Sequence, residues 1–252
     1  MTAGGEASGS VIVAPVSEFE QSRLREQSIT PSRACPWRPG VRVALASIAM
    51  VETRNASIDF FDRQFRLQIE GSDYSLNPFE RAALPFLRGE ALDLGCGLGN
   101  LSLAAAERGA RITALDASST AVADLTRRAQ ARGLAVSAQA VDLLHWRPER
   151  TWDAVACIGL LMFFPQDAAR AGLAAVRDAV RPGGVAIVNA LVEGTTYLDM
   201  FGPSGYYLFR PGELACAFAG WEIASNEASE YPAPQGRTKR FETVIASRPL
   251  GS

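Results

Sequence analysis

The sequence predicts an α/β fold, a doubly wound sheet of mostly parallel strands with helices on both faces. Short apolar runs alternate with helical stretches of about 10–15 residues from residue 89 onward, which is the pattern of βαβ units and a parallel sheet. A glycine-rich turn joins the first of these runs to the first helix. The chain has 252 residues, of which 48% are hydrophobic, and this is enough for one large domain of that class.

The N-terminal segment differs from the rest of the chain. Residues 1–49 begin with small polar residues, hold three prolines between positions 30 and 42, and show no sustained periodicity. We expect a disordered extension here, and we hypothesise that the well-patterned sequence from Met50 onward folds without it. The expected parts are thus this extension, a helical lid segment over residues 50–88, and a main domain over residues 89–249.

Two helices are expected in the lid segment. In the first, apolar residues recur at intervals of three and four and form one inward-facing stripe of Ile58, Phe61, Phe65 and Ile69. Ser57 is its expected N-cap. A polar loop follows, and Asn77 then caps a second helix that has Pro78 at its first position and runs to about Leu87.

The main domain contains seven expected strands and four expected helices. The strands are expected at residues 91–94, 111–116, 134–141, 152–158, 185–191, 221–224 and 241–247. The helices are expected at residues 100–108, 118–132, 167–180 and 213–218. Ser118 or Ser119 caps the second of these helices, Gly133 ends it, and an Arg-Pro-Gly-Gly turn at 181–184 stops the third.

The glycine-rich turn and its acidic neighbours carry the functional signal. Glycine permits a left-handed backbone and lets a ligand approach the chain closely where a central strand leads into a helix. The spacing here is Gly-x-Gly-x-Gly from Gly95 to Gly99, which differs from the Gly-x-Gly-x-x-Gly fingerprint of dinucleotide-binding proteins. Asp93 lies two residues before the first glycine, inside the strand, and Asp116 ends the second strand. An acid at that second position can accept hydrogen bonds from both hydroxyls of a ribose.

A third acid, Asp142, follows the third strand and reaches the same edge of the sheet. It could accept a hydrogen bond from the exocyclic amine of an adenine. Taken alone, Asp142 fits a solvated loop acid better. Because Asp93 and Asp116 lie at the matching ends of neighbouring strands, we favour a place for Asp142 in the site.

These motifs together resemble the class I S-adenosylmethionine-dependent methyltransferases. The motifs are Asp93-x-Gly95-x-Gly97-x-Gly99, the strand-end Asp116, the pair Asp142-Leu143, and the turn Arg181-Pro182-Gly183-Gly184. The resemblance covers roughly residues 57–248. The amino-acid sequences of the glycine loop and of residues 159–164 are most similar to those of the tellurite-resistance-like branch of small-molecule methyltransferases. The resemblance implies a Rossmann-like sheet of seven strands whose last strand is antiparallel.

The resemblance also implies S-adenosylmethionine as the cofactor and assigns its contacts. Implied for the methionine moiety are Asp93 and the backbone of Gly95, Cys96 and Gly97; for the ribose, Asp116; for the adenine, Ala117, Asp142 and Leu143; and for the floor near the sulfonium, Ile158 and Gly159. Methyl transfer asks the protein mainly to position an acceptor lone pair and exclude water. We therefore expect no catalytic triad and assign no catalytic residue.

Candidates on the acceptor side follow from position in the fold. Tyr74 lies in the loop of the lid segment, where a lid or substrate role and a plain surface role are about equally expected. Thr195 and Tyr197 follow the fifth strand at the ligand edge, where loops often carry function. His145, the one histidine of the chain, could act as a general base, but we expect a surface loop residue.

Composition limits the partners. The net charge of −2 gives no support for a nucleic-acid groove or an anionic membrane surface, and no apolar run approaches the roughly 20 residues that span a bilayer. The four cysteines are far apart and form no Cys-x-x-Cys pair, so we expect reduced thiols, a cytoplasmic protein and no metal site. The expected protein is a monomer or homodimer that acts on a small-molecule acceptor.

Two other classes stay open. One is a catalytically silent module that binds S-adenosylmethionine for regulation, since binding motifs survive the loss of catalysis. The other is a nicotinamide-dependent oxidoreductase on a similar sheet, against which the glycine spacing and Asp93 argue.

Overall fold

The protein is described by a computed structural model, which covers residues 27–28, 56–202 and 205–251. Its strands are Gln27–Ser28 (β1), Glu90–Leu94 (β2), Arg111–Asp116 (β3), Val136–Ala140 (β4), Trp152–Ile158 (β5), Val180–Leu191 (β6), Glu222–Ala233 (β7) and Arg237–Ser247 (β8). Its α-helices are Ala56–Gly71 (α2), Pro78–Ala83 (α3), Asn100–Glu107 (α4), Ser119–Ala131 (α5), Gln166–Ala179 (α6) and Glu213–Ala217 (α7). Three short 3-10 helices are Leu84–Phe86 (η1), Leu161–Phe163 (η2) and Pro234–Gly236 (η3).

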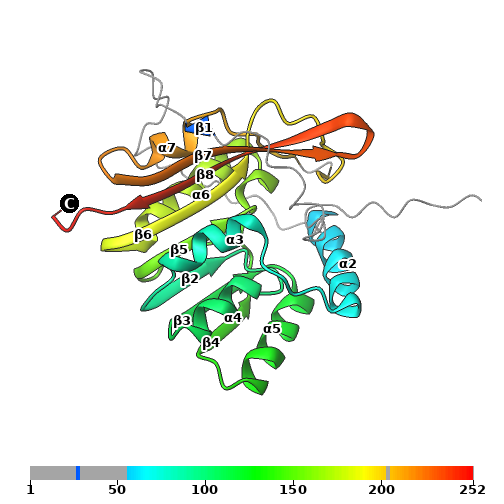
Figure 1. The fold of residues 1–252 in the computed structure, drawn as a ribbon, viewed down its shortest axis with the longest axis vertical. Helices are drawn as coiled ribbons and strands as arrows, with labels where there is room; N and C mark the ends of the chain where they lie inside the picture. The colour runs from blue at the N-terminus through cyan, green and yellow to red at the C-terminus, as the bar shows by residue number, and fades with distance from the viewer. Residues whose placement is uncertain (1–26, 29–55, 203–204, 252) are drawn as a thin grey trace, which may run out of the picture.

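All the strands belong to one sheet in the order β1-β7-β8-β6-β5-β2-β3-β4 (Figure 1). Strands β2 to β6 are parallel to one another, and β8 is antiparallel to both of its neighbours. The predicted seven-stranded, mostly parallel sheet with an antiparallel last strand is thus confirmed. The two residues of β1 add a short antiparallel strand at the β7 edge. The remainder of the expected N-terminal extension lies outside the described residues, so its dispensability stays a prediction.

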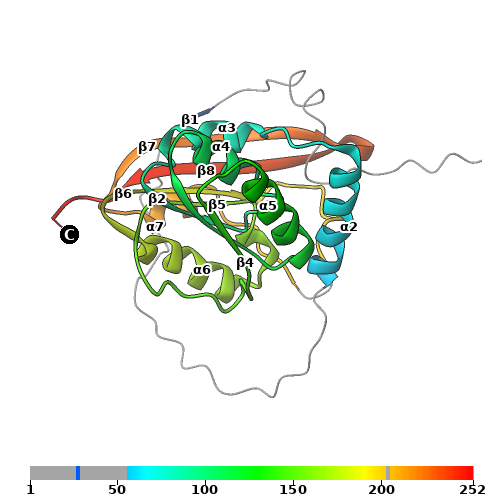
Figure 2. The ribbon, with the colours of Figure 1, turned by 90° about the horizontal axis from the view of Figure 1, so that it is seen from below.

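Helices cover both faces of the sheet, as Figure 2 shows for α6 and α7 on one side and α3, α4 and α5 on the other. Strand β5 shows why the sheet needs both layers. Val155 and Cys157 point into the cluster that contains α6, whereas Ala154 and Ala156 point into the cluster that contains α4. A central strand that is apolar on both faces is stable only when both faces are covered.

Helix boundaries follow the capping signals. Asn77 and Glu80 form a capping box at the start of α3, Ser118 caps α5 through the amide of Ala121, and Gly133 follows α5 with a φ of 62°. Helix α2 begins at Ala56, so Ser57 lies inside the first turn, and the prediction that Ser57 is the N-cap is wrong. No helix among the described residues is long and apolar enough to cross a membrane.

The last two strands are longer than predicted. Strand β7 covers 12 residues and β8 covers 11, and they form a long antiparallel ribbon that reaches past β6 toward α2 (Figure 1). The basic run Arg237-Thr238-Lys239-Arg240 lies within β8. It is accommodated there because Arg237 pairs with Asp199, at 2.6 Å, and Arg240 pairs with Glu230, at 3.2 Å.

Glycine at position 99 is required for two separate reasons, and a Gly99→Ala variant tests them. Its φ is 69°, and a Cβ there would lie 2.4 Å from the side chain of Leu125. Gly133 is the matched control, because its φ of 62° is similar but a Cβ would meet nothing within 4 Å. We expect Gly133→Ala to cost about 1–2 kcal/mol for the left-handed backbone, and Gly99→Ala to cost about 1–3 kcal/mol more for overpacking. Urea unfolding measures both, and equal losses would contradict the packing argument.

Candidate functional site

The glycine loop between β2 and α4 forms the floor of the candidate site. Gly95, Gly97 and Gly99 have φ values of 78°, 51° and 69°, a left-handed region that suits glycine. A Cβ on Gly95 would lie 3.1 Å from Leu160, and a Cβ on Gly97 would lie 3.2 Å from the ring of Phe65. Larger residues would therefore strain the loop and crowd the groups above it. The bare backbone at this position is what the close approach of a cofactor requires.

Asp116 is held at the end of β3, directly beside this loop. Its Oδ2 accepts a hydrogen bond from the Gly97 amide and its Oδ1 accepts one from the Ser118 amide, both at 2.8 Å. The residue is 9% exposed, and burial raises the pKa of its carboxyl although these hydrogen bonds act in the opposite direction. Each carboxylate oxygen can accept more than one hydrogen bond. The carboxylate is thus oriented by the backbone and keeps acceptor capacity for a ligand.

Asp93 lies on β2, below the loop. It is 4% exposed, and its Oδ2 accepts a hydrogen bond from the Ser102 hydroxyl at 2.6 Å. Burial raises the pKa of Asp93 to about 6, and the charge of Asp116 adds to the rise. Burial likewise raises the pKa of Glu80, on α3, to about 7, with a contribution from Asp93. Burial, with a smaller contribution from neighbouring carboxylates, thus disfavours the ionised forms of Asp93 and Glu80, and a cationic ligand would offset this effect.

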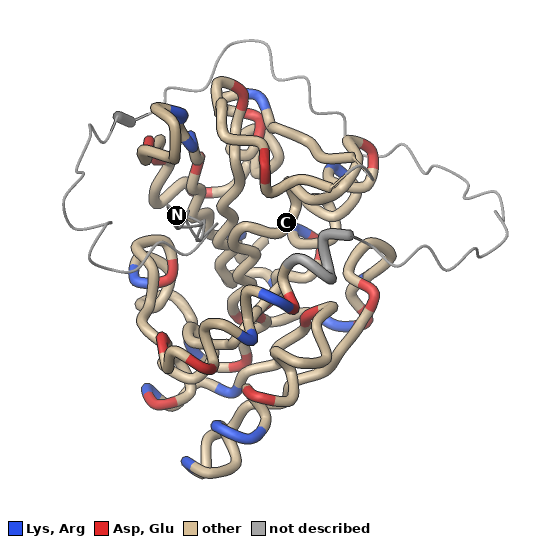
Figure 3. Tube along the Cα trace, turned by 90° about the vertical axis from the view of Figure 1, so that its right-hand side faces the viewer, with Lys and Arg blue, Asp and Glu red and all other residues tan. Residues whose placement is uncertain are grey.

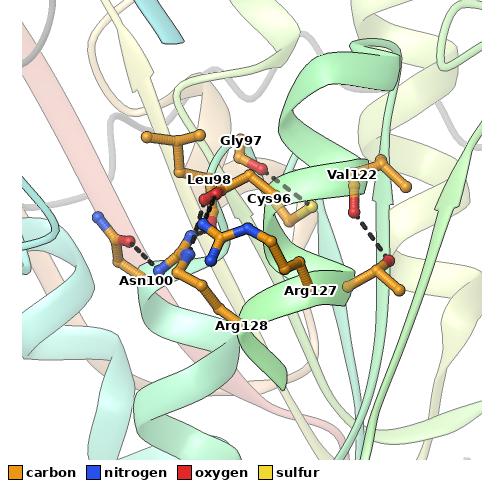
Figure 4. A network of polar contacts seen from close by, with 9 residues as sticks. Cys96, Gly97, Leu98, Asn100, Val122, Arg127 and Arg128 are labelled. Atoms are coloured by element: carbon orange, nitrogen blue, oxygen red, sulfur yellow. Dashed lines mark hydrogen bonds and ion pairs between the residues drawn. The ribbon is translucent and has the colours of Figure 1, made fainter. Parts of the chain in front are cut away.

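Arg128 of α5 braces the glycine loop from outside (Figure 4). Its guanidinium donates to the carbonyl of Leu98 and, at 3.3 Å, to Oδ1 of Asn100, the first residue of α4. Its Nε donates to Asp124 at 2.7 Å, and the ring of Tyr74 lies 4.1 Å from the guanidinium carbon. One nearly buried cation therefore connects the lid segment, the glycine loop and α5.

Helix α2 closes over the site. Its Asp62 accepts a short hydrogen bond from the hydroxyl of Ser118, the residue that caps α5. About one turn after Asp62, the ring of Phe65 covers Gly97. The ring of Phe61, just before Asp62, meets the ring of Phe163 edge to face, with centroids 4.8 Å apart. In Figure 3 the molecule is seen from the side on which α2 lies, and acidic and basic segments are interspersed over it.

The predicted adenine contacts are partly together. Leu143 is buried and Ala117 is partly buried against the same core cluster, as is Ile158, which was predicted for the floor near the sulfonium. The side chain of Asp142 is 66% exposed, and its Oδ2 lies 2.6 Å from Nδ1 of His145. Burial alone would raise the pKa of Asp142, but the hydrogen bonds from His145 and from a backbone amide outweigh it and lower that pKa. His145 lies on the surface as expected, whereas the adenine role of Asp142 stays a prediction.

The three acceptor-side candidates have structural partners. Tyr74 stacks on Arg128, as described above. Thr195 is buried, and its hydroxyl pairs with both the amide and the carbonyl of Arg240 in β8. Tyr197 is buried beneath Arg237 and Lys239, at 4.7 and 5.0 Å from its ring centroid. Their contact with an acceptor stays a prediction.

Three residues of the site were not among the predicted ones. Ser102 and Arg128 act through contacts between elements, and no local pattern marks them. Glu80 had a visible signal, because Asn77-x-x-Glu80 is a capping-box sequence whose acid must lie near the start of α3. Within the described ranges, no group of three or more metal-binding side chains is present, and Cys96 and Cys157 are buried thiols outside any disulfide.

Comparison with known proteins agrees with this geometry. Residues 91–184, from β2 into β6, match the family described as a methyltransferase domain. Over 140 residues, the chain is 32% identical to the ubiquinone biosynthesis O-methyltransferase of Paraburkholderia xenovorans. That match covers 49% of this chain and 60% of the relative, so the chain spans less than two thirds of the length of this relative.

Solved structures share the fold. TehB from Haemophilus influenzae has a TM-score of 0.60 at 18% identity, with 76% of this chain and 67% of that chain covered. The complex of DhpI with S-adenosylhomocysteine has a TM-score of 0.51 at 26% identity, with 77% and 98% covered. The family match, the fold shared with these neighbours, the strand order and the glycine loop agree that residues 91–184 carry a methyltransferase domain.

Proposed function

We propose that the protein transfers the methyl group of S-adenosylmethionine to a small-molecule acceptor. The observation that carries this proposal is the buried carboxylate of Asp116, fixed by the amides of Gly97 and Ser118 beside a left-handed glycine loop. This arrangement suits the two hydroxyls of a ribose. Asp93 and the loop backbone suit the cationic methionine end, Ala117 and Leu143 offer apolar contacts for the adenine, and Ile158 offers one near the sulfonium.

The chain supplies positioning and exclusion of water more than acid–base chemistry. When bound, S-adenosylmethionine would supply a methyl group on a sulfonium for an acceptor lone pair, and Asp93, Asp116 and the backbone of the glycine loop would hold the cofactor in place. Helix α2 covers the glycine loop and keeps water away from it. No catalytic residue is assigned, because His145 lies on the surface with Asp142.

The proposal extends to the acceptor and to the state of the protein. A small-molecule acceptor is supported by the relatives, which include a ubiquinone biosynthesis O-methyltransferase. The mixed charges of the face in Figure 3 favour such an acceptor over a nucleic acid. We further propose a cytoplasmic monomer or homodimer.

Calorimetric titration tests the cofactor and the role of Asp116. We expect micromolar binding of S-adenosylmethionine and S-adenosylhomocysteine and no binding of NADH. Asp116→Ala should weaken cofactor binding by about 1–3 kcal/mol, because the ribose hydroxyls lose their acceptor. Unchanged affinity in Asp116→Ala would mean that the ribose lies elsewhere, and binding of NADH alone would contradict the whole assignment. Formation of a methylated product separates an enzyme from a silent binding module.

The raised pKa of Asp93 predicts a pH-dependent affinity. A cationic ligand favours the ionised carboxylate, so the affinity for S-adenosylmethionine should rise as the pH increases through the pKa of about 6 and level off above it. Asp93→Asn should remove most of this dependence between pH 5 and 7.5, where a change of one unit is worth at most about 1.4 kcal/mol. An equally steep dependence in the variant would assign it to another group, such as Glu80.

Arg128 and Arg127 make a matched pair for testing the brace on the glycine loop. Both contact Asp124, but Arg128 alone of the two donates to Leu98, and Arg127 is 65% exposed. We expect Arg128→Met to weaken cofactor binding by about 1–3 kcal/mol, since a charged hydrogen bond to the loop is lost, whereas Arg127→Met should change it by less than about 0.5 kcal/mol. Equal affinities of the two variants, measured by calorimetry, would show that the brace does not act on the cofactor.

A further inference from the structure

A row of aromatic rings leads from the glycine loop to the surface. The row, in order, consists of Phe65, Phe61, Phe163, Phe201 and Tyr206. Successive ring centroids lie 5.9, 4.8, 5.2 and 4.3 Å apart. These separations are in the range of favourable aromatic pairs. The inner end covers Gly97, and the outer ring, Tyr206, is 41% exposed.

The row is assembled from segments that lie far apart in the sequence. Phe65 and Phe61 come from α2, Phe163 comes from η2 after β5, and Phe201 and Tyr206 follow β6. Ligands of doubly wound sheets bind outside the carboxyl ends of the strands. The end of β5 lies next to the end of β2, which carries the glycine loop, and the end of β6 lies beside that of β5. The row therefore occupies the edge where an acceptor must approach the methyl group.

The chemistry of the row limits what can bind along it. All five side chains are aromatic and none is charged, and the neighbouring carboxylate of Asp62 is already bonded to Ser118. A charged acceptor would lose hydration against these rings, and the rings themselves offer it no ionic partner. A flat aromatic molecule could extend the row by stacking on its outer ring. Phe201 and Tyr206 are nearly parallel, at 10°, and one face of such a stack can hold another ring.

We propose that the methyl acceptor is an uncharged aromatic molecule bearing a nucleophilic heteroatom, and that Tyr206 stacks on its ring. This inference rests on the proposed methyl transfer and adds the substrate class. Tyr206 acts as a determinant of specificity through its ring, and the ring rather than the hydroxyl makes the contact.

The test uses 2-naphthol as the probe, with the full chain loaded with S-adenosylhomocysteine. Binding is followed by the fluorescence of the naphthol. We expect 2-naphthol to bind more tightly than its saturated counterpart decahydro-2-naphthol and than the anion 2-naphthoate, these two being followed by displacement of 2-naphthol. Tyr206→Ala should weaken 2-naphthol binding about three- to tenfold, whereas Tyr206→Phe, the matched control, should change it less than twofold. Because Tyr206 is exposed, both variants should keep the unfolding midpoint of the parent protein.

Several outcomes would overturn the inference. Equal binding of 2-naphthol and decahydro-2-naphthol, tighter binding of 2-naphthoate, or equal losses in Tyr206→Ala and Tyr206→Phe would each contradict a stacked, uncharged aromatic acceptor. So would the absence of 2-naphthol binding to protein that binds S-adenosylhomocysteine. Failure of S-adenosylhomocysteine to bind in the preceding calorimetric titration would instead contradict the proposed function, so the two failures are distinguishable.

Discussion

The hydrogen bond from the Gly97 amide to the carboxylate of Asp116 is the contact on which the site depends. It joins the turn after β2 to the end of β3, and both strands lie in the parallel centre of the sheet. Because glycine holds the turn in a left-handed conformation, the amide points toward the neighbouring strand. The second amide, from Ser118, belongs to the residue that caps α5 and bonds to α2. One carboxylate thereby ties together strands β2 and β3, helix α5 and helix α2 of the lid segment.

Buried acids make the site unstable in itself and receptive to a cation. The pKa values of Asp93 and Glu80 are raised to about 6 and about 7, so the ionised carboxylates are disfavoured by their surroundings. Only Ser102 and a helix-cap amide offset this by hydrogen bonding. A ligand that brings positive charge therefore gains affinity from repulsion already present in the free protein. The preference for a cationic ligand is thus built into the fold, which places these acids on neighbouring elements.

The sequence predicted the parts of the structure that local patterns determine. The bounds of β5 agreed at both ends because the strand is apolar on both faces, and the count of seven strands with an antiparallel last strand followed from the family resemblance. Strand β7 was predicted too short, since most of it alternates polar residues over a partly exposed surface and lacks an apolar run. The acids at strand ends were found because strand ends share one edge. The partners of Arg128 and Ser102 were not, because those contacts join elements through side chains whose direction no spacing reveals.

Strand β1 has a consequence for how copies of the chain meet. An unpaired strand edge is a template for another chain, and β7 lies next to the end of the sheet, where β1 covers it at Ala228 and Glu227. Glutamates at positions 222, 227 and 230 also make this edge unattractive for pairing. Removal of the N-terminal segment would uncover the edge, and the predicted independence of the main domain from that segment implies that the site would stay intact. A shortened chain could then fold and bind cofactor normally while associating edge to edge with its own copies.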